Sequence, residues 1–181
     1  MSSKHYVNNR TLFEALIEYK KKVKEAKDKQ LPKPRIPNYI GECFFQIATR
    51  LSTKPNFVNY TYRDEMISDA LENCISVVDN FDPEKSSNPF AYFTQIIHYA
   101  FLRRILKEKK HLYIKYKTMQ NAYLNGALSN QQEIDELKEV DASYLDNEYM
   151  NNLVKQYEET VEEKRIKTKM KKKGLEKFID E

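Results

Sequence analysis

Glycine is scarce in this chain, and that scarcity constrains the fold more than any other feature. Only three of the 181 residues are glycines, at Gly41, Gly126 and Gly174. Strands joined by tight turns normally need more glycine, because those turns use positive φ angles. Apolar residues instead recur at intervals of three and four, which is the period of a helix buried on one face. The sequence therefore predicts an all-α fold.

The N-terminal half of the chain is expected to hold two helices separated by a linker. Thr11 and Glu14 have the spacing of a capping box, which predicts that the first helix begins near Thr11. Prolines at about residues 30–38 interrupt the pattern, because each lacks an amide donor and favours extended geometry before it. A second helix is expected over residues 39–51, and a polar loop over residues 52–60.

Capping residues mark two further helices. Thr61 and Asp64 again have capping-box spacing and predict the start of the third helix. Asn88 followed by Pro89 predicts the start of the fourth, because asparagine is preferred at the N-cap and proline at the first helical position. The stripes expected to be buried are Ile67, Ala70, Leu71, Cys74, Val77 and Val78 on the third helix, and Phe90, Phe93, Ile97, Ala100, Phe101 and Ile105 on the fourth.

Charge divides the remainder of the chain. The formal net charge is only +4, but residues 131–163 hold eleven acidic and two basic side chains, and residues 164–173 hold seven basic ones and no acidic one. Such asymmetry is typical of separate binding surfaces or of a solvated tail. We expect a helical domain over residues 1–112, a charged helical extension over 113–173 and a short tail over 174–181.

The residues give little support for catalysis. His5, His98 and His111 are scattered, and neither a Cys/His ligand spacing nor a glycine-rich phosphate loop occurs. Cys43 and Cys74 fall on apolar helical faces, as small buried hydrophobes do in a reducing compartment. No apolar run approaches the ~18 residues of a membrane span, and no signal peptide opens the chain. We expect a cytosolic binding protein without a cofactor and not an enzyme.

One face of the fourth helix has the composition of a nucleic-acid surface. Exposed aromatic rings beside arginine suit single-stranded DNA, because each stacked base is worth about 1–3 kcal/mol and arginine engages phosphate. A basic helix end beyond that face can follow a DNA backbone. The residues expected to bind DNA are Tyr92, Gln95, Tyr99, Arg103, Arg104 and Lys107, of which the first four form what we call the DNA face. In the alternative interpretation the tyrosines pack at the edge of the core and the basic run is a solvated helix end.

The third helix carries a second candidate surface. Its acidic ridge, with an apolar residue at one end, comprises Glu65, Ser68, Asp69, Glu72 and Ile75. An exposed isoleucine among acids favours a docking surface, although acidic ridges are also commonly just solvated. At the end of the chain, Leu175, Phe178 and Ile179 lie among acids and resemble a linear motif that inserts side chains into a partner's pocket, or a helix end packed on its own protein.

Several short motifs resemble a known family. Residues 81–85 (Phe-Asp-Pro-Glu-Lys), residues 90–94 (Phe-Ala-Tyr-Phe-Thr) and the pair Arg103-Arg104 are similar to region 2 of bacterial sigma factors of the sigma-70 family. The chain resembles the late-transcription sigma factors of T-even-type bacteriophages more closely still. The segments that carry this closer resemblance are Tyr6-Val-Asn-Asn9, Glu65-Met-Ile67, Asn80-Phe-Asp82, Asn88-Pro89, Ala91-Tyr92 and Thr94-Gln95.

The resemblance implies two binding roles for the surfaces described above. It implies that the acidic ridge binds the clamp-helix coiled coil of the largest subunit of the host RNA polymerase core. It also implies that the fourth helix captures the non-template strand of a −10-like TATA element, with Tyr92 stacking on a base held out of the duplex. Gln95 and Ile96 stand where host-type factors carry two tryptophans, and Pro89 replaces an aromatic. Fewer such aromatics imply weaker promoter melting.

The resemblance also implies partners beyond the polymerase and the promoter. Phage late factors are activated by the replication sliding clamp, which Leu175, Phe178 and Ile179 would engage in this chain. Residues 113–181 lack the pattern of a domain that reads a −35 element, so a separate late co-activator is a possible further partner. The expected location is the cytoplasm of an infected bacterial host. The alternative function is a helical DNA-binding adaptor or repressor that acts on duplex DNA without polymerase.

Overall fold

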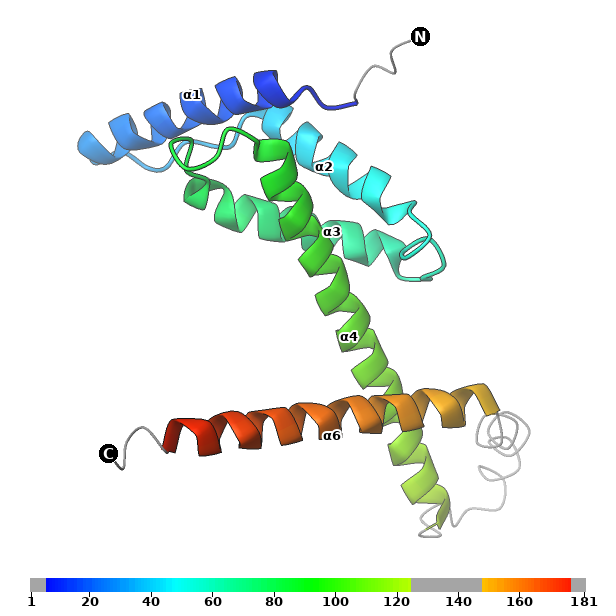
Figure 1. Cartoon of the computed structure of the whole chain (residues 1–181). Coiled ribbons are helices and arrows are strands. Elements are labelled where there is room, and N and C mark those ends of the chain that lie inside the picture. The colour runs from blue at the N-terminus through cyan, green and yellow to red at the C-terminus, as the bar shows by residue number, and fades with distance from the viewer. Residues whose placement is uncertain (1–5, 125–147, 177–181) are drawn as a thin grey trace. The chain divides into compact units, whose positions relative to one another are not determined.

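The computed structural model describes residues 6–124 and 148–176, and every regular element in those ranges is helical (Figure 1). The expected all-α fold class is confirmed. No helix in the described ranges combines the length and apolar character needed to cross a lipid bilayer. The elements are α1 Asn9–Asp28, α2 Asn38–Ser52, α3 Arg63–Val77, the 3-10 turn η1 Val78–Asn80, α4 Pro89–Leu124 and α6 Glu148–Glu176.

The chain divides into two compact units, Met1–Ile105 and Leu106–Glu181. The first contains α1, α2, α3 and the first half of α4, and Figure 1 shows the first turns of α4 gathered among the other three helices. Each helix buries residues at helical spacing in one apolar core, in which Phe44 of α2 and Phe93 of α4 lie 4.4 Å apart between ring centroids. The fully buried side chains include Leu12, Leu16, Tyr19, Ile40, Phe44, Ile47, Met66, Phe81, Phe93, Ile97 and Phe101.

The start of α1 differs from the prediction. The helix begins at Asn9, and Asn8 is its N-cap, with the side-chain Oδ1 accepting from the backbone N–H of Arg10 (3.0 Å) and of Thr11 (3.2 Å). The predicted start near Thr11 and its capping box with Glu14 are therefore wrong. Asparagine caps at least as well as threonine, so the earlier residue satisfies the orphan amides and Thr11 falls within the first turn.

The predicted capping box of the third helix is also wrong. α3 begins at Arg63 after Tyr62, and no side chain caps its first amides. Tyr62 and Tyr60 pack against the core with ring centroids 5.2 Å apart, so tertiary burial of aromatic rings fixes where the helix begins. Asp64 and Glu65 still lie in the first turn, where negative charge complements the helix dipole.

The linker between α1 and α2 is tied to the helical domain at several points. Lys33 forms an ion pair with Asp79 (2.5 Å), and the Tyr19 hydroxyl donates to the carbonyl of Pro34 (3.5 Å). α1 ends in a left-handed residue, Gln30 (φ 53°), and the next amide, of Leu31, donates back to Ala26 (2.8 Å). Glycine is usual at this position, because it adopts a positive φ without strain. This glycine-poor chain has glutamine there instead.

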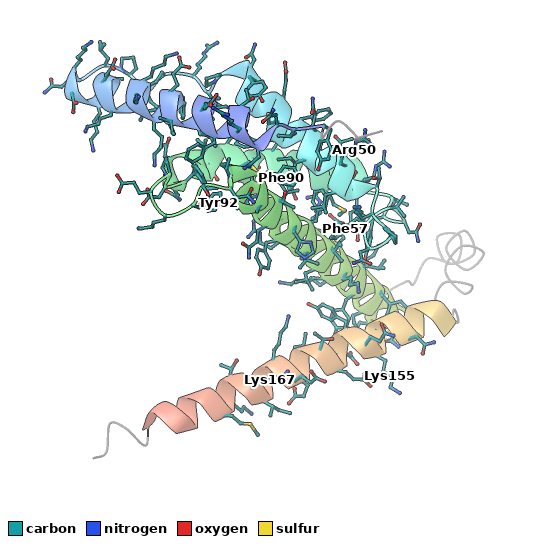
Figure 2. All side chains as sticks on the ribbon, turned by 45° about the horizontal axis from the view of Figure 1, so that its top comes forward. Arg50, Phe57, Phe90, Tyr92, Lys155 and Lys167 are labelled. Atoms are coloured by element: carbon teal, nitrogen blue, oxygen red, sulfur yellow. The ribbon has the colours of Figure 1, made fainter. Side chains whose placement is uncertain are left out.

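The loop after α2 contains a core residue that the sequence pattern did not indicate. Phe57 is only 3% exposed, and its ring packs edge-on against Phe101 of α4 (5.1 Å) and His98 (5.5 Å). The polar residues around Phe57 predict a solvated loop, whereas the single phenylalanine anchors that loop to α4, as Figure 2 shows. A lone aromatic has no period, so no pattern of spacing could have revealed its burial.

The second unit pairs the end of α4 with α6 through tyrosines. Tyr116 and Val154 are buried against each other, and the rings of Tyr113 and Tyr157 stack at 4.7 Å. Glu158 completes the contact by accepting from the hydroxyl of Tyr113 (3.2 Å) and pairing with Lys117 (3.1 Å). The Lys117 hydrogen bond lowers the pKa of the Glu158 carboxyl.

Replacing Phe57 by alanine is expected to lower the free energy of unfolding by about 3–5 kcal/mol, because it removes a buried ring and leaves a cavity beside α4. The neighbouring Val58 is 43% exposed and is the matched control, since Val58→Ala should change stability by no more than about 0.5 kcal/mol. Urea unfolding followed by circular dichroism measures both variants. A similar decrease in the free energy of unfolding for both variants would show that the Phe57 ring does not anchor this loop to α4.

Candidate functional site

The first turn of α4 is positioned by the N-terminal segment of the chain. The side-chain Oδ1 of Asn88 accepts from the N–H of Ala91 (3.0 Å), which confirms Asn88 as N-cap and Pro89 as the first helical residue. The preceding amide, of Phe90, is capped by a distant residue instead: its N–H donates to Oδ1 of Asn9 (3.1 Å). Tyr6 rests edge-on against Phe90 (5.9 Å). Two asparagines from opposite ends of the domain therefore fix the helix that carries the DNA face.

The DNA face lies opposite the buried stripe of α4. Gln95, Tyr99 and Arg103 are exposed, and Tyr99 is 51% exposed. Tyr92 differs, because it is half-buried with its ring against Phe81 (5.3 Å) and Phe93 (5.1 Å). The edge-of-core interpretation therefore describes Tyr92 better than Tyr99. Figure 2 shows Tyr92 and Phe90 on the same first turns of α4.

A groove of about 460 Å³ runs along one flank of the DNA face. It shares Gln95 and Tyr99 with that face, while Tyr92 and Arg103 lie outside it. Its position depends on α2, which supplies one wall, so the spacing of residues on α4 alone did not reveal it. The lining residues are Leu51, Phe90, Ala91, Thr94, Gln95, His98 and Tyr99.

The basic end of the DNA face is joined to α3. Arg103 donates through Nη2 to Oδ1 of Asn73 (2.6 Å), and Arg104 lies 3.5 Å from the carboxylate of Asp69. We call these two contacts the α3–α4 clasp. The side chain of Arg104 is only 16% exposed, so much of its charge is matched within the domain. Lys107 is exposed on the continuation of α4 in the second unit.

The acidic ridge is exposed along most of its length. Glu65, Ser68 and Glu72 are exposed, and Ile75 is 50% exposed at the end of α3. Asp69 is half-buried because it belongs to the clasp. The ridge and the basic end of the DNA face therefore meet at Asp69 and Asn73, and the spacing of residues on α3 did not indicate that Asn73 bridges them.

The expected sliding-clamp motif at the end of the chain lies mostly outside the described residues. Leu175 lies in the last turn of α6, and Phe178 and Ile179 lie outside the described residues.

The buried thiols have no accessible chemistry. Cys43 and Cys74 are free and buried, and burial raises the pKa of the Cys74 thiol to about 12. Burial also raises the pKa of Cys43. A protonated, enclosed thiol is a poor nucleophile and a poor metal ligand. Within residues 6–124 and 148–176, no group of His, Cys, Asp and Glu side chains is arranged to hold a metal ion.

Comparison of the chain with protein-family models and with curated proteins found no match.

Asn9→Ala is expected to lower the free energy of unfolding by about 1 kcal/mol, because the N–H of Phe90 loses its acceptor. Asn9→Asp keeps an acceptor and adds negative charge at a helix N-terminus, so it should remain close to the parent chain in stability. Denaturant unfolding measures both, with exposed Asn59→Ala as the matched asparagine control. Equal losses in Asn9→Ala and Asn9→Asp would argue against capping as the role of Asn9.

Proposed function

We propose that this chain is a sigma factor of the phage late-transcription type, which binds the host RNA polymerase core and directs it to promoters with a −10-like TATA element. The observation that carries the proposal is the DNA face: tyrosine, glutamine and arginine project from one side of a helix whose opposite side is locked into the core. The same helix carries the motifs that resemble sigma region 2.

The DNA face is suited to single-stranded DNA more than to duplex. Tyr99 offers an exposed ring for stacking, and Arg103 lies one turn further along the helix to meet phosphate. The adjoining groove, of about 460 Å³, could accept part of an unstacked base, and its lining includes the polar side chains of Gln95 and Thr94. Because α4 is capped at both Phe90 and Ala91, this surface is presented on a fixed helix end.

Tyr92 has a narrower role in this proposal than the resemblance alone implies. Its ring is half-buried against Phe81 and Phe93, so only part of the ring is left for a base to stack on. A ring held in this way loses little side-chain freedom when a base stacks on it. Ile96 is partly buried against the core and is not a second exposed wedge. These features support a factor that captures a melted strand and is weak at opening it.

The acidic ridge is the proposed contact with the polymerase core. Glu65 and Glu72 make no ion pair within the described part of the chain, so their charge is open to a basic partner. Ile75 adds an exposed apolar group at the end of the same helix face. By charge complementarity the partner surface is basic with an apolar spot, which fits a helical coiled coil of the largest polymerase subunit as the resemblance implies.

The C-terminal residues complete the proposal. Leu175, Phe178 and Ile179 would engage the phage sliding clamp, and a separate co-activator would take the place of a −35-reading domain. Both assignments rest on the resemblance and on the character of the tail sequence.

Run-off transcription tests the proposal. Purified host core polymerase is supplied with supercoiled DNA that carries a TATAAATA-like element, with and without the full chain. Transcripts that start just downstream of the element and require the chain are expected. Absence of transcripts, together with no binding to core polymerase, would favour the adaptor or repressor instead.

Variants of Tyr92 refine that experiment. Tyr92→Ala should reduce chain-dependent transcripts, while Tyr92→Phe should preserve them because the stacking ring remains. Since Tyr92 also packs on the core, both variants are first compared in polymerase binding, which should be unchanged. Full transcription by Tyr92→Ala would remove Tyr92 from strand capture.

Charge reversal tests the acidic ridge separately. Glu72→Lys should weaken binding to core polymerase about tenfold, which corresponds to about 1.4 kcal/mol, because it places like charge against a basic partner. Glu42→Lys on α2 is the matched control, since Glu42 is also exposed. Fluorescence anisotropy of the labelled chain gives both affinities. If the two variants weaken binding equally, net charge rather than the acidic ridge is responsible.

A further inference from the structure

Beyond Tyr19, α1 contributes little to the core, where only Val23 packs against it as a partly buried side chain. Tyr19 is the last buried residue of the helix, yet the helix continues to Asp28. In Figures 1 and 2 this end of α1 extends past the loop that leads into α4. We call residues Lys20–Lys29 the α1 arm. A helix extension of this kind gains little from burial, which is the usual source of helical stability in a protein.

The α1 arm and the linker that follows it concentrate positive charge. Residues 20–35 hold eight basic side chains and two acidic ones, so this segment alone exceeds the net charge of +4 of the whole chain. Figure 2 shows nitrogen-tipped side chains spreading from this end of α1. The basic residues are Lys20, Lys21, Lys22, Lys24, Lys27, Lys29, Lys33 and Arg35.

Three of these eight basic side chains make contacts within the domain, two at the start of the arm and one in the linker. Lys20 donates to the backbone carbonyl of Phe81, Lys22 pairs with Glu18 (2.7 Å), and Lys33 pairs with Asp79 (2.5 Å). In the part of the chain that the structure describes, the other five make no ion pair and are exposed. These five are Lys21, Lys24, Lys27, Lys29 and Arg35.

The charge of the arm is not explained by helix stability. Lysines three and four residues apart repel one another by about 0.2–0.5 kcal/mol per pair, as Lys20, Lys24 and Lys27 do. The helix dipole favours positive charge only in the last turn, which holds Lys27. An external polyanion would offset this repulsion.

We propose that the α1 arm binds the phosphate backbone of duplex DNA without regard to sequence. Four of the five cations without an ion pair lie within nine residues of the arm, and Arg35 lies in the linker that follows. Such a charge density suits a densely charged partner, and duplex DNA carries one negative charge per about 1.7 Å of its axis. The arm exposes no aromatic ring for bases to stack on, unlike the DNA face. Lysines on a helix of 1.5 Å rise per residue can instead follow successive phosphates.

The test measures binding of the free, full-length chain to a random-sequence DNA duplex by fluorescence anisotropy over a range of salt concentrations. The triple variant Lys24→Gln, Lys27→Gln and Lys29→Gln should flatten the slope of log affinity against log salt by about 2–3, at about 0.9 per lost phosphate contact. Glutamine is a good helix former, so α1 should remain intact, which circular dichroism verifies.

Two further variants make the assignment specific to the arm. Replacing Glu25 and Asp28 by Gln and Asn removes the acids of the arm and should tighten binding. Lys164→Gln, Lys167→Gln and Lys169→Gln remove the same charge from exposed positions of α6 and should change the slope less. An unchanged slope in the arm variant, or equal changes from α1 and α6, would overturn the proposal.

A competition experiment separates DNA from an acidic protein as the partner. Polyglutamate at equal charge concentration should displace the duplex poorly, and displacement as effective as that by unlabelled DNA would assign the arm to acidic protein surfaces instead. Because these measurements use neither polymerase nor a promoter, their failure would leave the proposed sigma function intact, and failure of run-off transcription would leave the arm unaffected.

Discussion

Burial of the stripe Phe93, Ile97 and Phe101 is the constraint on which the rest of this molecule depends. These side chains are fully enclosed by α1, α2, α3 and the loop at Phe57, so α4 cannot rotate about its own axis without exposing them. Once that rotation is fixed, residues half a turn away must face solvent. Of the DNA face, Gln95 and Tyr99 are exposed and make no contact with the core, whereas Tyr92 packs at the edge of the core and Arg103 is hydrogen-bonded to Asn73.

The α3–α4 clasp gives the two candidate surfaces a common boundary. Arg103 and Arg104 belong to the basic end of α4, yet both contact polar side chains of α3. A partner that pulls on Asp69 would alter the environment of Arg104, and DNA that recruits Arg103 would release Asn73. The clasp therefore connects side chains of the two candidate surfaces directly.

The all-α class and the start of α4 could be predicted because both depend on local chemistry, namely helical periodicity and the preferences of Asn88 and Pro89 for adjacent helix positions. The predicted capping box at Thr11 was wrong because Asn8 caps α1 instead. The one at Thr61 was wrong because α3 begins after Tyr62, which packs with Tyr60, and has no side-chain cap. The roles of Asn9, Asn73 and Leu51 could not be read from spacing, since each depends on a contact made by a residue far away in the sequence.

The two cysteines have a practical consequence for anyone who wishes to follow this protein in solution. Both thiols are enclosed, and at neutral pH the fraction of Cys74 present as thiolate is vanishingly small, because its pKa is about 12. Maleimide and related probes react with the thiolate, so they should pass over the native cysteines of the folded chain. A single cysteine introduced at an exposed helical position could then carry a spectroscopic label without replacement of Cys43 and Cys74.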